Sequence, residues 1–211
     1  MGVQVSATQR RALVAIGLLW LVAVLGGMTA LTRYASTPGK PPEPLSRLPA
    51  DSPLRPAPGR ALLIMLAHPR CPCTRASLAE LEQVLTRASR PVDTYVLFLR
   101  PETTEGTWEQ GELWRRAASI PGVTVRTDAA GVAARSLGAT TSGHVLLVDA
   151  QGHLRFSGGI TRSRGHEGDN AGRATLEALL HGHQAPMQDR PPVYGCTLEE
   201  PAQHNAEGGA P

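Results

Sequence analysis

The residues best suited to chemistry are two of the chain's three cysteines, Cys71 and Cys73, which a single proline separates. A thiolate attacks disulfides, and two neighbouring thiols can be oxidised to a disulfide. The small ring that a C-x-C disulfide closes strains its geometry, which makes the bond easier to reduce. The spacing predicts a redox-active pair in which Cys71, as the more exposed thiol, attacks and Cys73 resolves. The alternative is a stable structural bridge, or two small buried side chains.

The segments around the pair predict a strand, a turn and a helix. Residues 61–67 are a continuous apolar run, which is typical of a strand buried on both faces. The helix that follows begins either at Thr74 as N-cap or at Ser77, which forms a capping box with Glu80. A cysteine in the first turn of a helix faces unpaired backbone N–H groups, which lower the pKa of its thiol.

The rest of the domain alternates strands and helices and then forms a hairpin. Thr107 and Gln110 form a further capping box, and residues 120–122 end that helix. The order predicts a mixed α/β sheet with helices on both faces. The predicted strands are 91–100, 123–127, 145–148 and 153–157, and the predicted helices are 107–119, 129–137 and 171–181.

This order, with cysteines at the first strand–helix turn, resembles the thioredoxin fold over residues 60–183. The phrases HPRCPCTRASLAEL, TSGHVLLVDAQGHLRFSGGITRSRGHEGDNAG and VYGC resemble the bacterial RedB proteins, a membrane-anchored, thioredoxin-like family. The resemblance implies the fold and little specific chemistry. The chain departs from the thioredoxin pattern in two places: C-x-C replaces C-x-x-C, and Gly143 stands at the position of the cis-proline.

The thioredoxin-like topology implies that the loop of residues 158–170 lies beside the cysteines. An arginine there can stabilise a thiolate, and His166 can act as proton donor or base. The alternative is a polar connection in which Asp169 or Asn170 caps the last helix. The other candidates that the loop offers are Arg162, Arg164 and Glu167.

Cys196 is the third cysteine, and the chain before it is long enough to return to the pair. It can pair with Cys71 or Cys73 as a resolving thiol, or it can be a free or intermolecular thiol. It can also complete a metal site, because three thiolates and an imidazole suit copper or zinc. The imidazole candidates are His68, His144 and His166.

The N-terminal part predicts a membrane anchor. Residues 12–31 carry no charge, and a helix of that length spans about 30 Å, the thickness of a bilayer core. Arg10 and Arg11 predict a cytoplasmic N-terminus and a single pass through the bacterial inner membrane. The predicted organisation is a cytoplasmic start (1–11), an anchor (12–32), a proline-rich spacer (33–59), the thioredoxin-like domain (60–183) and a tail (184–211).

Together these features predict a membrane-anchored periplasmic thiol–disulfide oxidoreductase that needs no cofactor. Its partners would be extracytoplasmic protein thiols or disulfides. The first alternative is a non-enzymatic protein that binds or delivers copper. A peroxidase is the second, although no threonine precedes Cys73 as in peroxiredoxins. The net charge is only +3, and no basic run is interleaved with aromatic residues, which argues against nucleic-acid binding.

Overall fold

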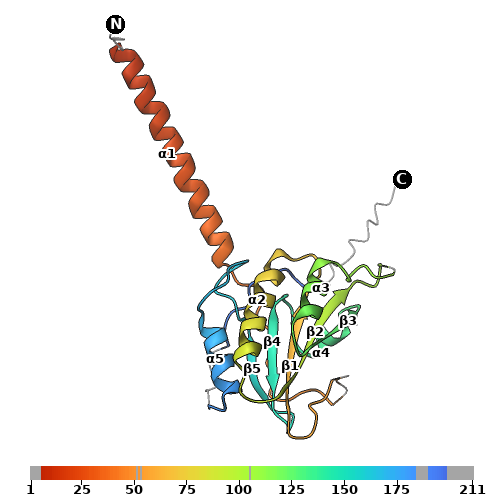
Figure 1. Cartoon of the computed structure of the whole chain (residues 1–211). Coiled ribbons are helices and arrows are strands. Elements are labelled where there is room, and N and C mark those ends of the chain that lie inside the picture. The colour runs from red at the N-terminus through yellow and green to blue at the C-terminus, as the bar shows by residue number, and fades with distance from the viewer. Residues whose placement is uncertain (1–5, 51, 53, 105, 184–189, 199–211) are drawn as a thin grey trace, which may run out of the picture. The chain divides into compact units, whose positions relative to one another are not determined.

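The computed structural model of the chain describes residues 6–50, 52, 54–104, 106–183 and 190–198 (Figure 1). The chain divides into two compact units, Met1–Thr37 and Pro38–Pro211. The first contains one helix and the second contains the sheet. Each unit is described by itself below.

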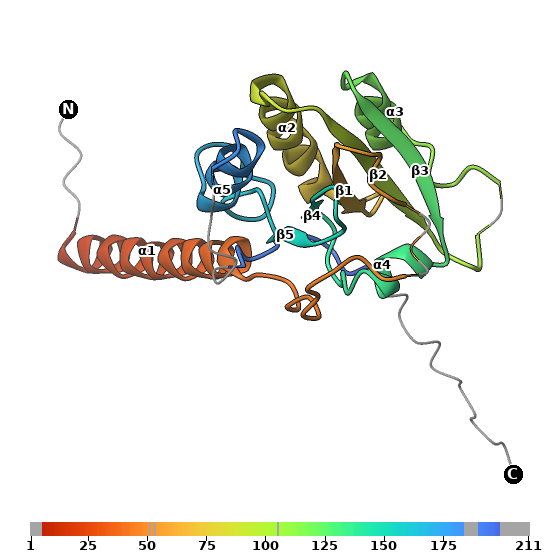
Figure 2. The same cartoon turned by 90° about the horizontal axis from the view of Figure 1, so that it is seen from below.

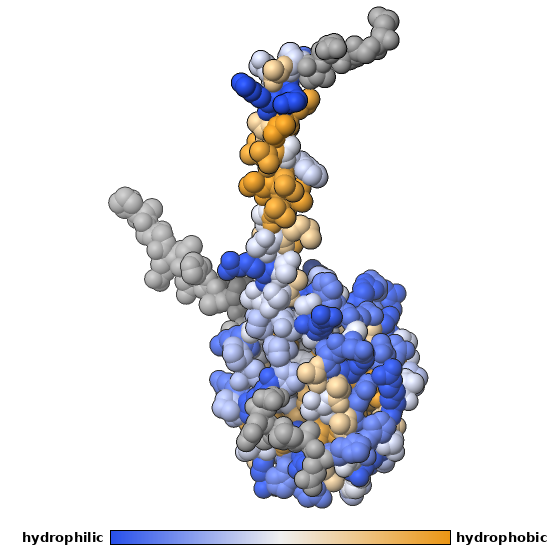
Figure 3. All heavy atoms as spheres, turned by 90° about the vertical axis from the view of Figure 1, so that its left-hand side faces the viewer, coloured by the Kyte–Doolittle hydropathy of each residue, from blue (hydrophilic) through white to orange (hydrophobic). Residues whose placement is uncertain are grey.

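Helix α1 (Ala7–Ser36) forms the first unit. Ser6 and Gln9 form a capping box at its start, so the helix begins before the charged Arg10 and Arg11. Its most apolar stretch has a mean hydropathy of 2.3, and its large apolar side chains are exposed, as the orange spheres in Figure 3 show. By length and composition α1 can cross a membrane, and a signal sequence would have the same properties. The predicted anchor lies inside it.

Among its described residues, the second unit contains five strands and four helices. Strands and helices alternate as far as β4, and a hairpin and a last helix follow. This confirms the predicted order. The strands are β1 (Ala61–Ala67), β2 (Val92–Arg100), β3 (Val123–Ala129), β4 (His144–Val148) and β5 (Leu154–Gly158). The helices are α2 (Pro72–Arg87), α3 (Glu112–Ser119), α4 (Val132–Ser136) and α5 (Ala171–Leu180).

The strands form one sheet in the order β3-β2-β1-β4-β5. Strands β1, β2 and β3 are parallel, whereas β4 runs antiparallel to both β1 and β5. The β1-α2-β2 unit and the β4-β5-α5 unit, joined at β1 and β4, make the thioredoxin-like fold. The segment α3-β3-α4 adds one parallel strand at the edge (Figure 2).

The two faces of the sheet carry separate cores because alternate residues of β1 point to opposite sides. Leu63 and Met65 belong to a core with apolar side chains of α2, α3 and α5. Leu62 and Ile64 belong to a second core with α4. Helices cover both faces, as predicted. The apolar run in β1 is required because both of its faces are buried.

The segment expected to be a spacer packs on the second core instead. Leu54 is buried there, and Leu45 and Leu48 are packed against it. Its backbone is also bonded to the domain, since the N–H of Leu48 donates to the carbonyl of Gly152 at 3.0 Å. The spacer prediction was therefore wrong for the described residues from Pro38 onward. Apolar residues between the prolines provide the binding energy that a free linker lacks.

Three predicted helix starts were wrong. The helix predicted from residue 129 begins at Val132, because Ala129 belongs to β3 and Gly131 is the N-cap of α4. Helix α2 begins directly after Cys71, because Pro72 has a preset φ that suits the first helical position. Ser77 and Glu80 are therefore in its interior rather than in a capping box. Helix α3 has Gly111 as its N-cap, because Thr107 accepts a bond from the N–H of Gln110 in a separate turn.

Candidate active site

The turn after β1 positions the two cysteines at the start of α2. Cys71 is the N-cap residue and Cys73 lies in the first turn. Cys71 is 0% exposed and Cys73 is 8% exposed, so the prediction that Cys71 is the more exposed thiol was wrong. Cys71 is buried because the tail covers this end of the sheet.

The Cys71 thiol has a lowered pKa although it is buried. Burial raises this pKa and is the largest single effect. A hydrogen bond from the Cys196 side chain and the backbone N–H groups of Cys196, Thr74 and Cys73 lower it more in sum. The N–H of Cys196 lies 3.3 Å from Sγ of Cys71. The site therefore favours the thiolate of Cys71, mainly through Cys196 and secondarily through N–H groups of the helix start, whereas Cys73 in the first turn has a raised pKa, contrary to the prediction for a first-turn cysteine.

The two other thiols are held in the protonated form. Burial raises the pKa of Cys73, and the negative charge and hydrogen bond of Cys71 raise it further. Burial also raises the pKa of Cys196, to about 12, again with the help of Cys71. Arg164 acts in the opposite direction on both thiols. Cys71 is thus the cysteine whose thiolate form is favoured, and its two neighbours are thiols with raised pKa values.

The tail reaches the cysteines through backbone pairing, which confirms that it returns to this end of the domain. Thr197 forms an antiparallel bridge with Thr141, and the N–H of Ser142 donates to the carbonyl of Cys196 at 2.8 Å. Leu198 is buried in the second core. Residues 190–198 are therefore part of the domain; the tail's other residues lie outside the described ones.

Gly143 stands directly before β4, at the position predicted from the thioredoxin pattern. Its φ is +88°, and a Cβ there would lie 2.6 Å from the hydroxyl oxygen of Ser77. Beside it, the hydroxyl of Ser142 contacts that of Thr74 at 2.8 Å and accepts from the N–H of His68 at 2.8 Å. Ser142 thereby links β1, α2 and the tail. The sequence analysis did not identify it as a site residue.

The loop of residues 158–170 lies beside the cysteines, as the topology implied. Nη1 of Arg164 donates to the carbonyl of Gly195 at 2.7 Å, and its charge acts on Cys73. His166 is exposed, and its Nδ1 lies 2.7 Å from the carbonyl oxygen of Arg164. Arg162 is exposed. Of the two arginines proposed to act on a thiolate, the structure places Arg164 at the site. Asn170 caps α5, as one alternative predicted.

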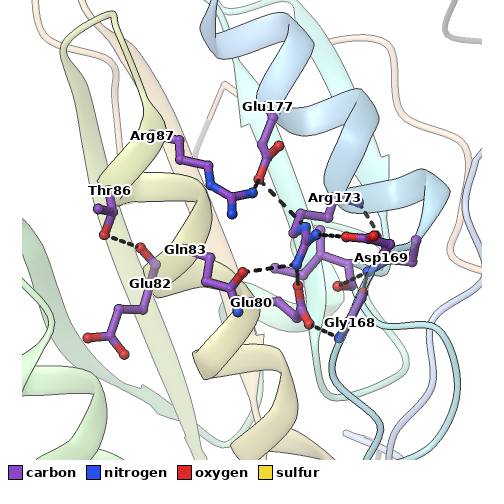
Figure 4. A network of polar contacts seen from close by, with 11 residues as sticks. Glu80, Glu82, Gln83, Thr86, Arg87, Gly168, Asp169, Arg173 and Glu177 are labelled. Atoms are coloured by element: carbon purple, nitrogen blue, oxygen red, sulfur yellow. Dashed lines mark hydrogen bonds and ion pairs between the residues drawn. The ribbon is translucent and has the colours of Figure 1, made fainter.

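A buried ion pair fixes the base of this loop to α2 (Figure 4). Nη1 of Arg173 lies 2.7 Å from Oε2 of Glu80, and the side chains are 8% and 0% exposed. Oε1 of Glu80 accepts from the N–H of Gly168 at 2.5 Å. Arg173 also contacts Asp169 and Glu177. The sequence analysis missed this network. The sequence feature that could have indicated this network is a charged residue, Glu80, between apolar positions of α2.

A shallow groove opens on the other side of the cysteine turn. Arg70 stacks over the ring of Trp108 at 4.4 Å, and the ring of His68 meets that of Trp108 edge-on at 5.9 Å. Burial, and secondarily Arg70, lower the pKa of His68. The groove has a volume of about 250 Å³ and is lined by Pro69, Arg70, Cys71, Pro72, Arg75, Glu112 and Leu113. It gives a partner a route to the turn.

The histidines considered as metal ligands have other contacts. Nε2 of His144 lies 2.8 Å from the hydroxyl of Ser157, and burial lowers its pKa to about 4. His68 packs on Trp108, and His166 is exposed. Within the part of the chain that the structure describes, no group of three or more His, Cys, Asp and Glu residues is arranged as metal ligands. The three sulfur atoms are what the site brings together.

No protein-family model and no curated protein matches this chain. Among solved structures, the hypothetical protein SMc02350 from Sinorhizobium meliloti is 19% identical with a TM-score of 0.57, covering 76% of this chain and 97% of that chain. An uncharacterized conserved protein from Geobacillus kaustophilus is 15% identical with a TM-score of 0.54, covering 80% and 93%. Both likenesses, at these identities, are likenesses of fold.

Proposed function

We propose that this protein is a membrane-anchored thiol–disulfide oxidoreductase that acts in the periplasm with the Cys71–Cys73 pair. The observation that carries the proposal is the stabilisation of the Cys71 thiolate at the start of α2, in hydrogen-bonding contact with a second thiol. A lowered thiol pKa beside a resolving thiol is what exchange chemistry requires. The resemblance to RedB proteins agrees with this class of function.

The reaction is a pair of thiol–disulfide exchanges. The Cys71 thiolate attacks one sulfur of a partner's disulfide, forms a mixed disulfide and releases the partner's other sulfur as a thiolate. The Cys73 thiol then loses its proton to that thiolate or to solvent and attacks the Cys71 sulfur. The products are a Cys71–Cys73 disulfide and a partner dithiol. The reverse sequence oxidises a partner dithiol, so the same site serves either direction.

The experiment is turnover of a model disulfide by the full-length protein in detergent. Cys71→Ser is expected to abolish turnover, because it removes the attacking thiolate. The double variant of Cys73→Ser and Cys196→Ser is expected to retain the first attack and to accumulate mixed disulfides, because no second thiol remains in the chain. Normal turnover by Cys71→Ser would refute the proposal. Ser119→Ala, which removes an exposed hydroxyl on α3, is the control for the effect of a substitution away from the site.

The proposed location rests on α1 and on Arg10 and Arg11 before its apolar stretch. A reporter that needs an oxidising compartment, fused after residue 211, is expected to be active. The protein is expected to fractionate with membranes. A soluble mature form that lacks α1 would show a cleaved signal sequence instead and would refute the anchor.

Copper binding is the second candidate function, and the contacts of Cys71 with two further thiols favour it, although the three cysteines are not arranged as a metal-ligand group in the described residues. Cys71 contacts the thiols of both Cys73 and Cys196, and thiolates are preferred ligands of Cu(I). The histidines add no ligand to this set in the described residues. Competition of the reduced protein with a chromogenic Cu(I) chelator tests it. Affinity that is the same in Cys196→Ser and wild type would refute a three-sulfur site.

A further inference from the structure

The Cys71 sulfur lies between two thiols that come from opposite ends of the domain sequence. Cys73 contacts it from the same turn, and Cys196 contacts it from the tail with both its side chain and its backbone N–H. Cys71 has hydrogen-bonding contacts with both other thiols. Cys71 is therefore placed to form a disulfide with either of them.

Backbone pairing holds Cys196 in place from one side. The Cys196 carbonyl accepts from Ser142, and the N–H of Leu198 donates to the carbonyl of Thr140 at 2.9 Å. The preceding Gly195 comes so close to the backbone of Ser142 that a Cβ at Gly195 would overlap the Ser142 carbonyl oxygen. Only glycine permits this approach. Backbone hydrogen bonds and the close approach at Gly195 therefore hold the tail in place, in addition to the apolar side chains at its end.

Arg164 holds the tail from the other side. Its guanidinium donates to the Gly195 carbonyl at 2.7 Å, and its loop is bonded through Gly168 to Glu80 of α2. The Arg173–Glu80 ion pair completes this connection (Figure 4). Because Cys71 is the N-cap of the same helix, the two sulfurs are attached to one rigid frame. Because both residues are already held in place, forming a Cys71–Cys196 bond in the folded protein costs little conformational entropy despite the long sequence separation.

We propose that Cys196 is a third redox-active cysteine and that Cys71 forms disulfides alternately with Cys73 and with Cys196. The inference rests on the proposed function and adds a second resolving thiol to it. A partner's disulfide is the oxidant: Cys71 attacks it, and Cys196 displaces the partner from the mixed disulfide. The Cys73 thiolate can then attack the Cys71 sulfur of the Cys71–Cys196 bond. That step breaks this bond, forms Cys71–Cys73 and returns Cys196 as a thiolate that takes up the proton Cys73 lost, with no net oxidation.

The strain of a C-x-C ring explains why a second disulfide, Cys71–Cys196, would be useful. A Cys71–Cys73 bond is easily reduced, whereas Cys71–Cys196 closes a large ring without that constraint. Moving the bond from Cys73 to Cys196 stores the oxidised state in a more stable form and secures the tail over Cys71. Moving it back returns Cys196 as a free thiol, while the backbone pairing of the tail with Thr140 and Ser142 is kept.

Disulfide mapping on full-length single-serine variants tests the inference. Each variant is equilibrated in dithiothreitol redox buffers, alkylated and digested for mass spectrometry. Cys73→Ser is expected to form an intramolecular Cys71–Cys196 bond, and Cys196→Ser a Cys71–Cys73 bond. Cys71→Ser is expected to keep both remaining thiols reduced at those potentials. The inference is overturned if Cys73→Ser forms no intramolecular disulfide at any potential that oxidises the wild-type protein.

Gly195→Ala tests the positioning while all three cysteines remain. In the Cys73→Ser background it is expected to lower the equilibrium constant for Cys71–Cys196 formation about tenfold or more, because the displaced tail lowers the effective concentration of Cys196. Gly111→Ala is the matched control, since its added Cβ has no atom within 4 Å. An equal constant in Gly195→Ala and the control would overturn the positioning argument.

The two proposals fail in different ways. Turnover that persists in Cys71→Ser refutes the oxidoreductase and the relay together. Turnover that needs Cys71 and Cys73, with no Cys71–Cys196 bond in any variant, refutes the relay alone. Turnover slowed in Cys196→Ser, together with the mapped Cys71–Cys196 bond, supports both.

Discussion

The backbone N–H of Cys196 lies 3.3 Å from Sγ of Cys71, although 125 positions separate the two residues in the sequence. A backbone donor aimed at a buried sulfur favours its thiolate form. The contact exists because the tail pairs with residues 140–142, next to the glycine that precedes β4. The chain's last described segment is thus part of the site.

The first prediction concerns the ionisation of Cys71. Its thiolate is expected to titrate below the ordinary thiol value of 9.0, because hydrogen bonds from Cys196 and the backbone outweigh burial. Ultraviolet thiolate absorbance of the reduced protein measures this titration without requiring reagent access. Cys71→Ser should remove the low transition, and Cys196→Ala, which removes the side-chain donor, should shift it to higher pH. An unchanged transition in Cys196→Ala would contradict the contact.

Most of the sheet could be predicted from the sequence because its signals are local. The apolar run of β1 and the hairpin of β4 and β5 were predicted near their observed bounds. Helix starts were less predictable, since several residues near Cys71 are plausible caps and Pro72 decided between them. The position of Cys71 and Cys73 at the strand–helix turn followed directly from these elements.

The exposure of the site could not be predicted, because it depends on contacts between distant segments. Cys71 is buried by a tail whose pairing with Thr141 and Ser142 leaves no periodic pattern in sequence. The Glu80–Arg173 pair has the same origin, since each residue alone resembles a surface charge on a helix. The packing of the proline-rich segment also depends on a groove that exists only in the folded sheet.

The second prediction concerns the glycine before β4. Gly143→Ala is expected to lower the free energy of unfolding by at least about 1–2 kcal/mol, because φ of +88° is unfavourable for alanine. The added Cβ also approaches the Ser77 hydroxyl at 2.6 Å. Urea unfolding measures the loss. The double variant with Ser77→Ala should recover the part due to that contact and retain the backbone cost; full stability of Gly143→Ala would contradict the observed backbone.

The third prediction concerns the buried ion pair of Glu80 and Arg173. Arg173→Met is expected to destabilise the protein by about 3–5 kcal/mol, because it leaves the buried Glu80 carboxylate without its cation. Glu80→Gln is expected to cost less, because Arg173 keeps Asp169 and Glu177 as partners. The double variant should lose less than the sum of both. A double-mutant cycle in urea gives the coupling energy. The exposed pair of Arg75 and Glu112 is the control, and its coupling is expected to be much weaker than that of Glu80 and Arg173.

The fourth prediction concerns pH and the buried His144. Burial, followed by the charge of Arg190, lowers the pKa of His144 from 6.5 to about 4. Below pH 6.5 the unfolded chain therefore binds a proton that the folded protein does not bind, and stability falls as pH falls. The loss is expected to be about 3 kcal/mol between pH 6.5 and pH 4, and to be absent above that window.

His144→Gln, which keeps a hydrogen-bonding group toward Ser157, should reduce the slope of unfolding free energy against pH in this range. His153→Gln, on the exposed hairpin turn, is the control. Equal slopes for His144→Gln and wild type would show that another group causes the acid sensitivity.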